Sequence, residues 1–66
     1  MSKALWEFLT ANEQDYIKSC GYGAFEVNSH PAVDTADMLW HYYAANGWIL
    51  GEALRRSHEI RNFEAE

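Results

Sequence analysis

The sequence predicts an all-α protein: a small single-domain bundle of three to four short helices spanning residues 1–66. With 66 residues, the chain has room for one hydrophobic core and none for a second domain. Apolar residues recur near helical spacing in three segments, and glycines follow two of them, where helices commonly end. The apolar link Trp48-Ile49-Leu50 is too short for an independent strand and has no partner of comparable length.

The first helical segment is expected at about residues 3–19, with Ser2 as its N-cap. Polar residues interrupt its apolar stripe near the middle, and Thr10 with Glu13 has the spacing of a capping box. Because a capping box marks the start of a helix, this segment is expected to be broken near residues 10–12 into two short helices.

A connector is expected at residues 21–33. Gly21 follows the first periodic segment, where glycine commonly ends a helix in the left-handed conformation. Pro31 disfavours helical dihedral angles in the residue that precedes it. A connector of this length is unusual in so small a domain, so Phe25 and Val27 are expected to attach it to the core.

A second helix is expected at residues 34–46. Asp34 suits the N-cap, and Asp34 and Asp37 together place negative charge near the positive end of the helix dipole. Bulky apolar and aromatic residues follow, which indicates a helix buried on more than one side. Asn46-Gly47 is expected to end it in the left-handed conformation.

The link Trp48-Ile49-Leu50 is expected to be a buried turn, and a third helix is expected at residues 52–63. Charged residues of both signs stand three and four positions apart on this helix, which favours a solvated face with ion pairs. These residues are Glu52, Arg55, Arg56 and Glu59.

Charge and composition exclude several classes of protein. Ten Asp and Glu against five Lys and Arg give a formal net charge of −5, the opposite of the basic patch typical of nucleic-acid-binding domains. No apolar run approaches the roughly 20 residues of a membrane span, and the first residues lack the apolar centre of a signal peptide. We therefore expect a cytoplasmic protein, in which Cys20, the sole cysteine, forms no intramolecular disulfide.

Residues that carry catalytic chemistry elsewhere do not combine into a recognisable site here. The three histidines and the cysteine lack metal-ligand spacing, and no glycine is followed by the Lys-Ser or Lys-Thr of a phosphate loop. The carboxylate pair Asp34 and Asp37 is explained by helix capping. The sequence therefore predicts a protein that is not an enzyme, with no metal and no cofactor.

The C-terminal half carries a motif with a family resemblance. Its residues are Tyr42, Tyr43, Asn46, Gly47, Trp48 and Gly51, followed by Arg61, Asn62, Phe63 and Glu64. This pattern resembles the helical domain at the C-terminal end of phage and prophage replication-organiser proteins, which is similar to the DnaT-like single-stranded-DNA-binding domain. The resemblance spans about residues 13–64.

The resemblance implies a small phage or prophage protein that acts in DNA replication by contacting single-stranded DNA or a replication protein. On this hypothesis Trp40 or Tyr43 supplies an exposed ring on which a base can stack. Three arginines meet phosphates or acidic groups of the partner. They are Arg55, Arg56 and Arg61.

The acidic charge favours an alternative hypothesis. A small rigid body with excess carboxylates can occupy a basic groove in place of nucleic acid, and so inhibit a host nucleic-acid-handling or defence complex such as a CRISPR effector. The carboxylates that would imitate phosphates are Glu7, Glu13, Asp15, Asp34 and Asp37. A homodimer formed by exposed aromatic residues is a third hypothesis.

Overall fold

The computed structural model describes residues 4–63, which are helical with no strand among them. The helices are α1 (Leu5–Phe8), α2 (Ala11–Ser19), α3 (Ala24–Ser29), α4 (Ala32–Ala45) and α5 (Leu50–Arg61). The all-helical class is therefore confirmed, and one helix more than the expected three to four is present. Ser2, the expected N-cap, lies outside the described residues.

The break within the first helical segment lies at Leu9 and Thr10, between α1 and α2. The predicted capping box is present. The Thr10 hydroxyl accepts from the Glu13 amide at 3.2 Å, and the Glu13 carboxylate accepts from the Thr10 amide at 2.9 Å. Two amides that the start of a helix leaves without backbone partners are thereby satisfied, which fixes where α2 begins.

The expected connector at residues 21–33 contains α3, so that prediction was wrong in part. Gly21 has φ +92° and ends α2 as expected, but Gly23 then donates its amide to the Glu26 carboxylate at 2.9 Å, which starts another helix. Val27 is buried in the core, as expected. Phe25, expected to be buried with it, is 79% exposed, because it lies two positions before Val27 on α3 and therefore faces away from the core.

The second predicted helix begins two residues earlier than expected, because Pro31 rather than Asp34 occupies the N-cap position of α4. Proline fits there, since a helix start needs no amide donor from it. Asp34 instead lies in the first turn, where its charge still favours the helix dipole. Gly47 has φ +70°, and the left-handed end of this helix is confirmed.

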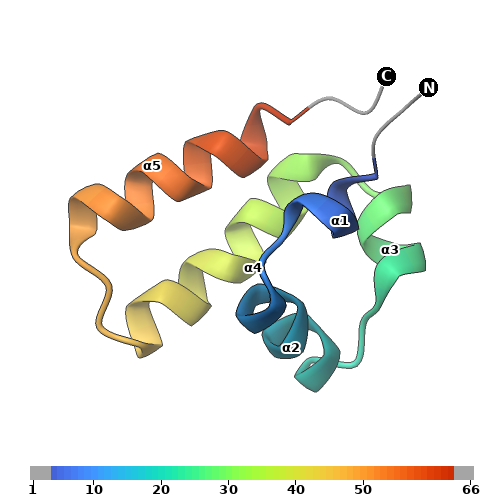
Figure 1. Ribbon diagram of the computed structural model, residues 1–66, viewed down its shortest axis with the longest axis horizontal. Helices are drawn as coiled ribbons and strands as arrows, with labels where there is room; N and C mark the ends of the chain where they lie inside the picture. The colour runs from blue at the N-terminus through green and yellow to red at the C-terminus, as the bar shows by residue number, and fades with distance from the viewer. Residues whose placement is uncertain (1–3, 64–66) are drawn as a thin grey trace.

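The link Trp48-Ile49-Leu50 is exposed, so the expected buried turn is wrong. Leu50 already belongs to α5, which starts two residues before the predicted helix at 52–63. The physical reason is the position of the link in the fold. The link closes the end of the hairpin formed by α4 and α5, and none of the other described helices extends to that end to cover it (Figure 1).

α4 runs through the middle of the molecule, with α5 returning alongside it and α1, α2 and α3 at the opposite side (Figure 1). The most extensive contact between elements is the one between α4 and α5. The core between the two groups of helices is made by Leu5, Leu9, Ile17, Val27, Ala36, Leu39, Tyr43, Ala53 and Ile60. None of the helices in residues 4–63 has the length and apolar character required to cross a membrane.

Two glycines give a matched test of these helix ends. At Gly47 an added Cβ meets no atom within 4 Å, but the positive φ is unfavourable for alanine, so Gly47→Ala should lower the free energy of unfolding by about 1 kcal/mol. Gly51 lies inside α5 with equally open space, so Gly51→Ala should raise it by about 0.5 kcal/mol. Urea denaturation of both variants measures the difference, and equal effects would contradict the assigned helix end.

Candidate docking surface at the end of the α4–α5 hairpin

The largest run of exposed apolar side chains lies at the closed end of the α4–α5 hairpin. We call it the hairpin surface, and its residues are Trp48 (37% exposed), Ile49 (68%), Leu50 (64%) and Leu54 (45%). The first three follow one another along the link, and Leu54 lies one helical turn after Leu50 on the same side of α5. Because soluble proteins rarely gather exposed apolar residues in this way, the hairpin surface is the candidate interaction site of the described chain.

Trp48 is held against the body of the protein by its aromatic neighbours. Its ring stacks on Tyr43, with centroids 4.2 Å apart and an interplanar angle of 29°, and it meets Tyr42 edge-on at 6.4 Å. The Trp48 amide also donates to the Tyr43 carbonyl oxygen at 3.1 Å. The exposed edge of the indole is therefore fixed in position by contacts within the chain.

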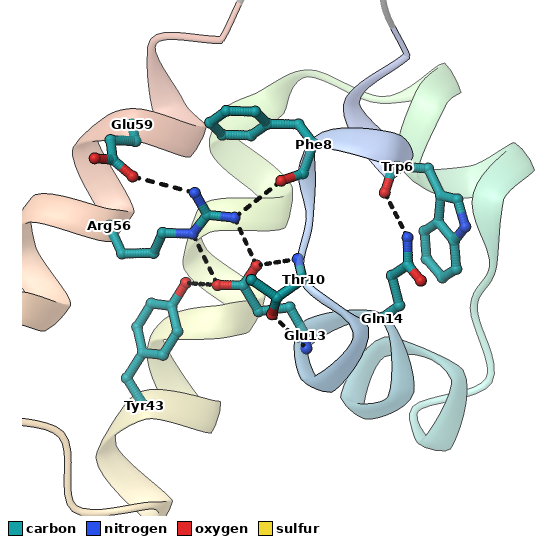
Figure 2. Close-up of polar contacts among 8 residues, drawn as sticks. All are labelled: Trp6, Phe8, Thr10, Glu13, Gln14, Tyr43, Arg56 and Glu59. Carbon is teal, nitrogen blue, oxygen red and sulfur yellow. Dashed lines mark hydrogen bonds and ion pairs between the residues drawn. The ribbon is translucent and has the colours of Figure 1, made fainter.

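Tyr43 is held in turn by a buried ion pair (Figure 2). The tyrosine is only 1% exposed, and its hydroxyl donates to Glu13 Oε2 at 2.7 Å. Arg56 grips the same carboxylate at both oxygens, through Nε at 2.9 Å and Nη2 at 2.8 Å. This two-point arrangement is the strongest form of an arginine–carboxylate contact.

The remaining donors of Arg56 reach two further segments. Nη2 donates to the Phe8 carbonyl oxygen and Nη1 to Glu59 Oε1, each at 3.1 Å, and the guanidinium lies 4.7 Å from the centre of the Phe8 ring. The network therefore joins α1, α2, α4 and α5 (Figure 2). Among the described residues, no buried side-chain nitrogen or oxygen lacks a hydrogen-bond partner.

The network also sets the charge states of its members. Burial raises the pKa of the Glu13 carboxyl, but hydrogen bonds from Arg56, the Thr10 amide and Tyr43 outweigh it, and the net pKa lies below 4.5. Burial and the negative Glu13 carboxylate raise the pKa of Tyr43, and the hydrogen bond to Glu13 raises the pKa of Arg56. At neutral pH the pair is therefore fully ionised and the tyrosine keeps its proton.

A groove of about 400 Å³ adjoins the hairpin surface at Leu54 and runs between α4 and α5. Its other lining residues are Asp37, Trp40, Ser57, His58 and Arg61. Arg61 Nη2 lies 3.3 Å from Asp37 Oδ1, and both side chains are exposed, so this ion pair contributes little to stability.

The structure removes three residues from the set predicted to bind nucleic acid or a partner. Tyr43 is buried and offers no exposed ring, which corrects that expectation. Arg56 is committed to Glu13, and its side chain is only 16% exposed. Glu13 is 1% exposed and cannot imitate a phosphate, because Arg56 and Tyr43 cover it.

The other predicted site residues remain accessible to different degrees. Arg55 is exposed, Arg61 pairs with Asp37, and Trp40 is half-buried in the groove. Three of the five acidic residues predicted to imitate phosphates stay exposed and form no ion pair among residues 4–63, and they lie on separate helices. They are Glu7 on α1, Asp15 on α2 and Asp34 on α4.

Sequence reasoning missed Ile49 and Leu50 as surface residues. The signal available was their position between Gly47 and Gly51, because apolar residues in a link this short between two helices can be covered only by another element. In a chain of 66 residues few elements remain to provide that cover.

Comparison of the chain with protein-family models, with curated proteins and with solved structures gives no match. The phage-domain resemblance is carried by the motif residues alone. In residues 4–63, no three His, Cys, Asp or Glu side chains come together as a group able to hold a metal ion. The hairpin surface is therefore argued from its own geometry.

Replacing the buried carboxylate tests how much the network contributes. Glu13→Gln keeps the shape but loses the charge, and an amide nitrogen then faces donors, so the free energy of unfolding should fall by about 2–3 kcal/mol. Thermal denaturation should show this as a loss of about 10–20 °C in Tm. The control is Glu7→Gln on the exposed face of α1, expected within about 0.5 kcal/mol of wild type. Equal Tm values for both variants would contradict the role of the pair.

The lowered pKa of Glu13 predicts a specific pH dependence. The folded state binds a proton at this carboxyl more weakly than the unfolded chain does. The stability that the ionised Glu13 contributes is therefore complete above about pH 4.5, and it is lost as the pH falls through the folded-state pKa. Urea denaturation from about pH 7 to about pH 3 should show the gap between wild type and Glu13→Gln shrinking only in the acid range. A constant gap would argue against a depressed pKa.

Proposed function

We propose that this chain is a binding protein without catalytic activity, which docks the hairpin surface into an apolar groove of a partner protein. The observation that carries the proposal is the exposure of Ile49 and Leu50, which no other part of the described chain covers. Burial of such a side chain in a partner gains about 1.5–3 kcal/mol. Binding to another protein that covers these side chains therefore releases this free energy, because it removes them from water.

The chemistry of the hairpin surface favours a protein over single-stranded DNA. Bases stack on aromatic rings, whereas most of this surface is aliphatic and offers no ring face. Phosphate binding needs several free cations. Arg56 and Arg61 already contact carboxylates of this chain, which leaves Arg55 as the arginine without an ion pair among residues 4–63. The net charge of −5 opposes a polyanion further.

Trp48 gives this surface a preorganised anchor. Tryptophan is enriched among the residues that dominate binding energy, and its cost of ordering on binding is small when it is already held. Here the stack on Tyr43 and the hydrogen bond from Tyr43 to Glu13 hold it. The buried network is thus linked to the proposed binding through a single aromatic contact.

The resemblance to the phage and prophage replication domain makes a replication protein the partner class to test first. Glu52 stands beside the hairpin surface, and the whole chain is acidic, so a groove with basic margins is the complementary partner. Charge of this kind affects mainly the association rate, while the apolar contacts determine how long the complex lasts.

A photo-crosslinker placed on the hairpin surface tests the proposal in the native cells. Ile49→p-benzoylphenylalanine should give one protein adduct, and the same group at Asp15 on α2 should not. The adduct protein is then purified and titrated. Ile49→Ser with Leu50→Ser should weaken its affinity at least about 100-fold. The matched control, Val33→Ser, removes an exposed apolar side chain on α4 and should leave the affinity unchanged.

The competing occupants have distinct outcomes. Adducts formed only with nucleic acid or with a second copy of the chain would overturn the proposal, as would an unchanged affinity of the double variant. A labelled single-stranded oligonucleotide titrated at low and at moderate salt should show no saturable anisotropy change. Salt-sensitive binding with quenching of Trp40 or Trp48 would instead support the DNA hypothesis.

A further inference from the structure

A second hollow lies between α3 and the first half of α4, formed by residues outside the hairpin surface. We call it the α3–α4 cleft, and it has a volume of about 190 Å³. Val27 and Thr35 lie deepest, since both are buried, and Tyr22 and Met38 add further apolar surface. The remaining lining residues are Glu26, His30 and Asp34.

The cleft has the size of one side chain. An apolar cavity of about 150 Å³ holds a benzene molecule, so 190 Å³ admits one aromatic ring or one leucine side chain. Tyr22, which lines the cleft, is 47% exposed, so part of the apolar wall also faces solvent. An inserted side chain therefore meets apolar groups from the buried floor to the exposed rim of the cleft.

The two carboxylates that line the cleft give its wall an acidic character. Its lining includes the carboxylates Glu26 and Asp34, whereas no Lys or Arg stands anywhere between Lys18 and Arg55 in the sequence. Among residues 4–63, Asp34 takes part in no ion pair. The carboxylate of Asp34 is therefore available to a cation from outside.

Two hydrogen bonds hold the α3 side of the cleft in shape. The Gly23 amide donates to Glu26 Oε1 at 2.9 Å, which fixes the carboxylate on α3. His30 Nδ1 lies 2.8 Å from the Glu26 carbonyl oxygen and donates to it, because a carbonyl only accepts. The side chains that line this wall are thus positioned without a ligand.

We propose that the α3–α4 cleft binds a basic segment of a partner protein. One aromatic or leucine side chain of that segment enters the cleft, and Lys or Arg residues on either side of it meet Glu26 and Asp34. The apolar insertion supplies most of the affinity, and the exposed ion pairs supply selectivity for a cationic sequence. This site does not depend on the hairpin surface, so either proposal can fail while the other stands.

Short capped peptides are the probes. An acetylated and amidated Gly-Arg-Phe-Arg-Gly is titrated into the ¹⁵N-labelled full chain, and amide shifts are followed by NMR. We expect saturable shifts at residues 22–38 and none at residues 48–54. Replacing the peptide phenylalanine with alanine should weaken binding about tenfold, and replacing its arginines with glutamates should weaken binding about fivefold.

Variants of the chain separate the two contributions. Tyr22→Ala should weaken binding of the arginine peptide, because the substitution removes one wall of the cleft. Asp34→Asn should weaken binding of the arginine peptide and should narrow the difference in affinity between the arginine and glutamate peptides. The control is Asp15→Asn on α2, which removes an equal charge outside the cleft and should change neither. The NMR spectrum of each variant also reports directly whether it is folded.

Three results would overturn the proposal. The first is equal affinity for the arginine and glutamate peptides, and the second is a set of shifts at the hairpin surface or spread over the whole chain. The third is concentration-dependent association of the chain by itself, with shifts at residues 22–38, which would identify a second copy as the occupant of the cleft.

Discussion

The ion pair between Glu13 and Arg56 is the contact on which the arrangement of the helices depends. The two residues are 43 positions apart in the chain, and through Phe8 and Tyr43 their hydrogen bonds extend to two further helices. Burial of a charge is costly unless the partner and the remaining hydrogen bonds are complete, and both oxygens of Glu13 are used here. A core of this size contributes only about 3–5 kcal/mol, so loss of one partner from this network, which leaves the other charge buried and unpaired, removes a large share of the total.

Local features of this fold were predictable from the sequence, and distant ones were not. The Thr10 capping box and the left-handed Gly21 and Gly47 depend on residues a few positions away, and each was found where expected. The partner of Glu13 lies in another helix, so spacing gave no sign of it. α3 was missed because six residues are shorter than two helical turns and show no clear period.

The candidate site was predictable only in outline. The sequence directed attention to aromatic residues of the second predicted helix and to arginines of the third, and the hairpin surface lies at the link between these two helices. Which of these residues face solvent depends on packing between helices: Tyr43 turns inward to Glu13, while Ile49 and Leu50 are left outside. The arginines divide in the same way, since Arg56 and Arg61 are taken up by carboxylates of the chain itself. Arg55 stays exposed and makes no ion pair among residues 4–63.

The Glu13–Arg56 pair also has a consequence for how this sequence can diverge. A change at either position alone leaves a buried charge without its counter-ion, whereas joint replacement by apolar residues of similar volume avoids that cost. Divergent copies of this protein should therefore exchange the two positions together, with Tyr43 following because its hydroxyl donates to the same carboxylate. Ile49, Leu50 and Leu54 of the hairpin surface take no part in this network, so each can vary independently of it, whereas Trp48 is tied to it through its stack on Tyr43.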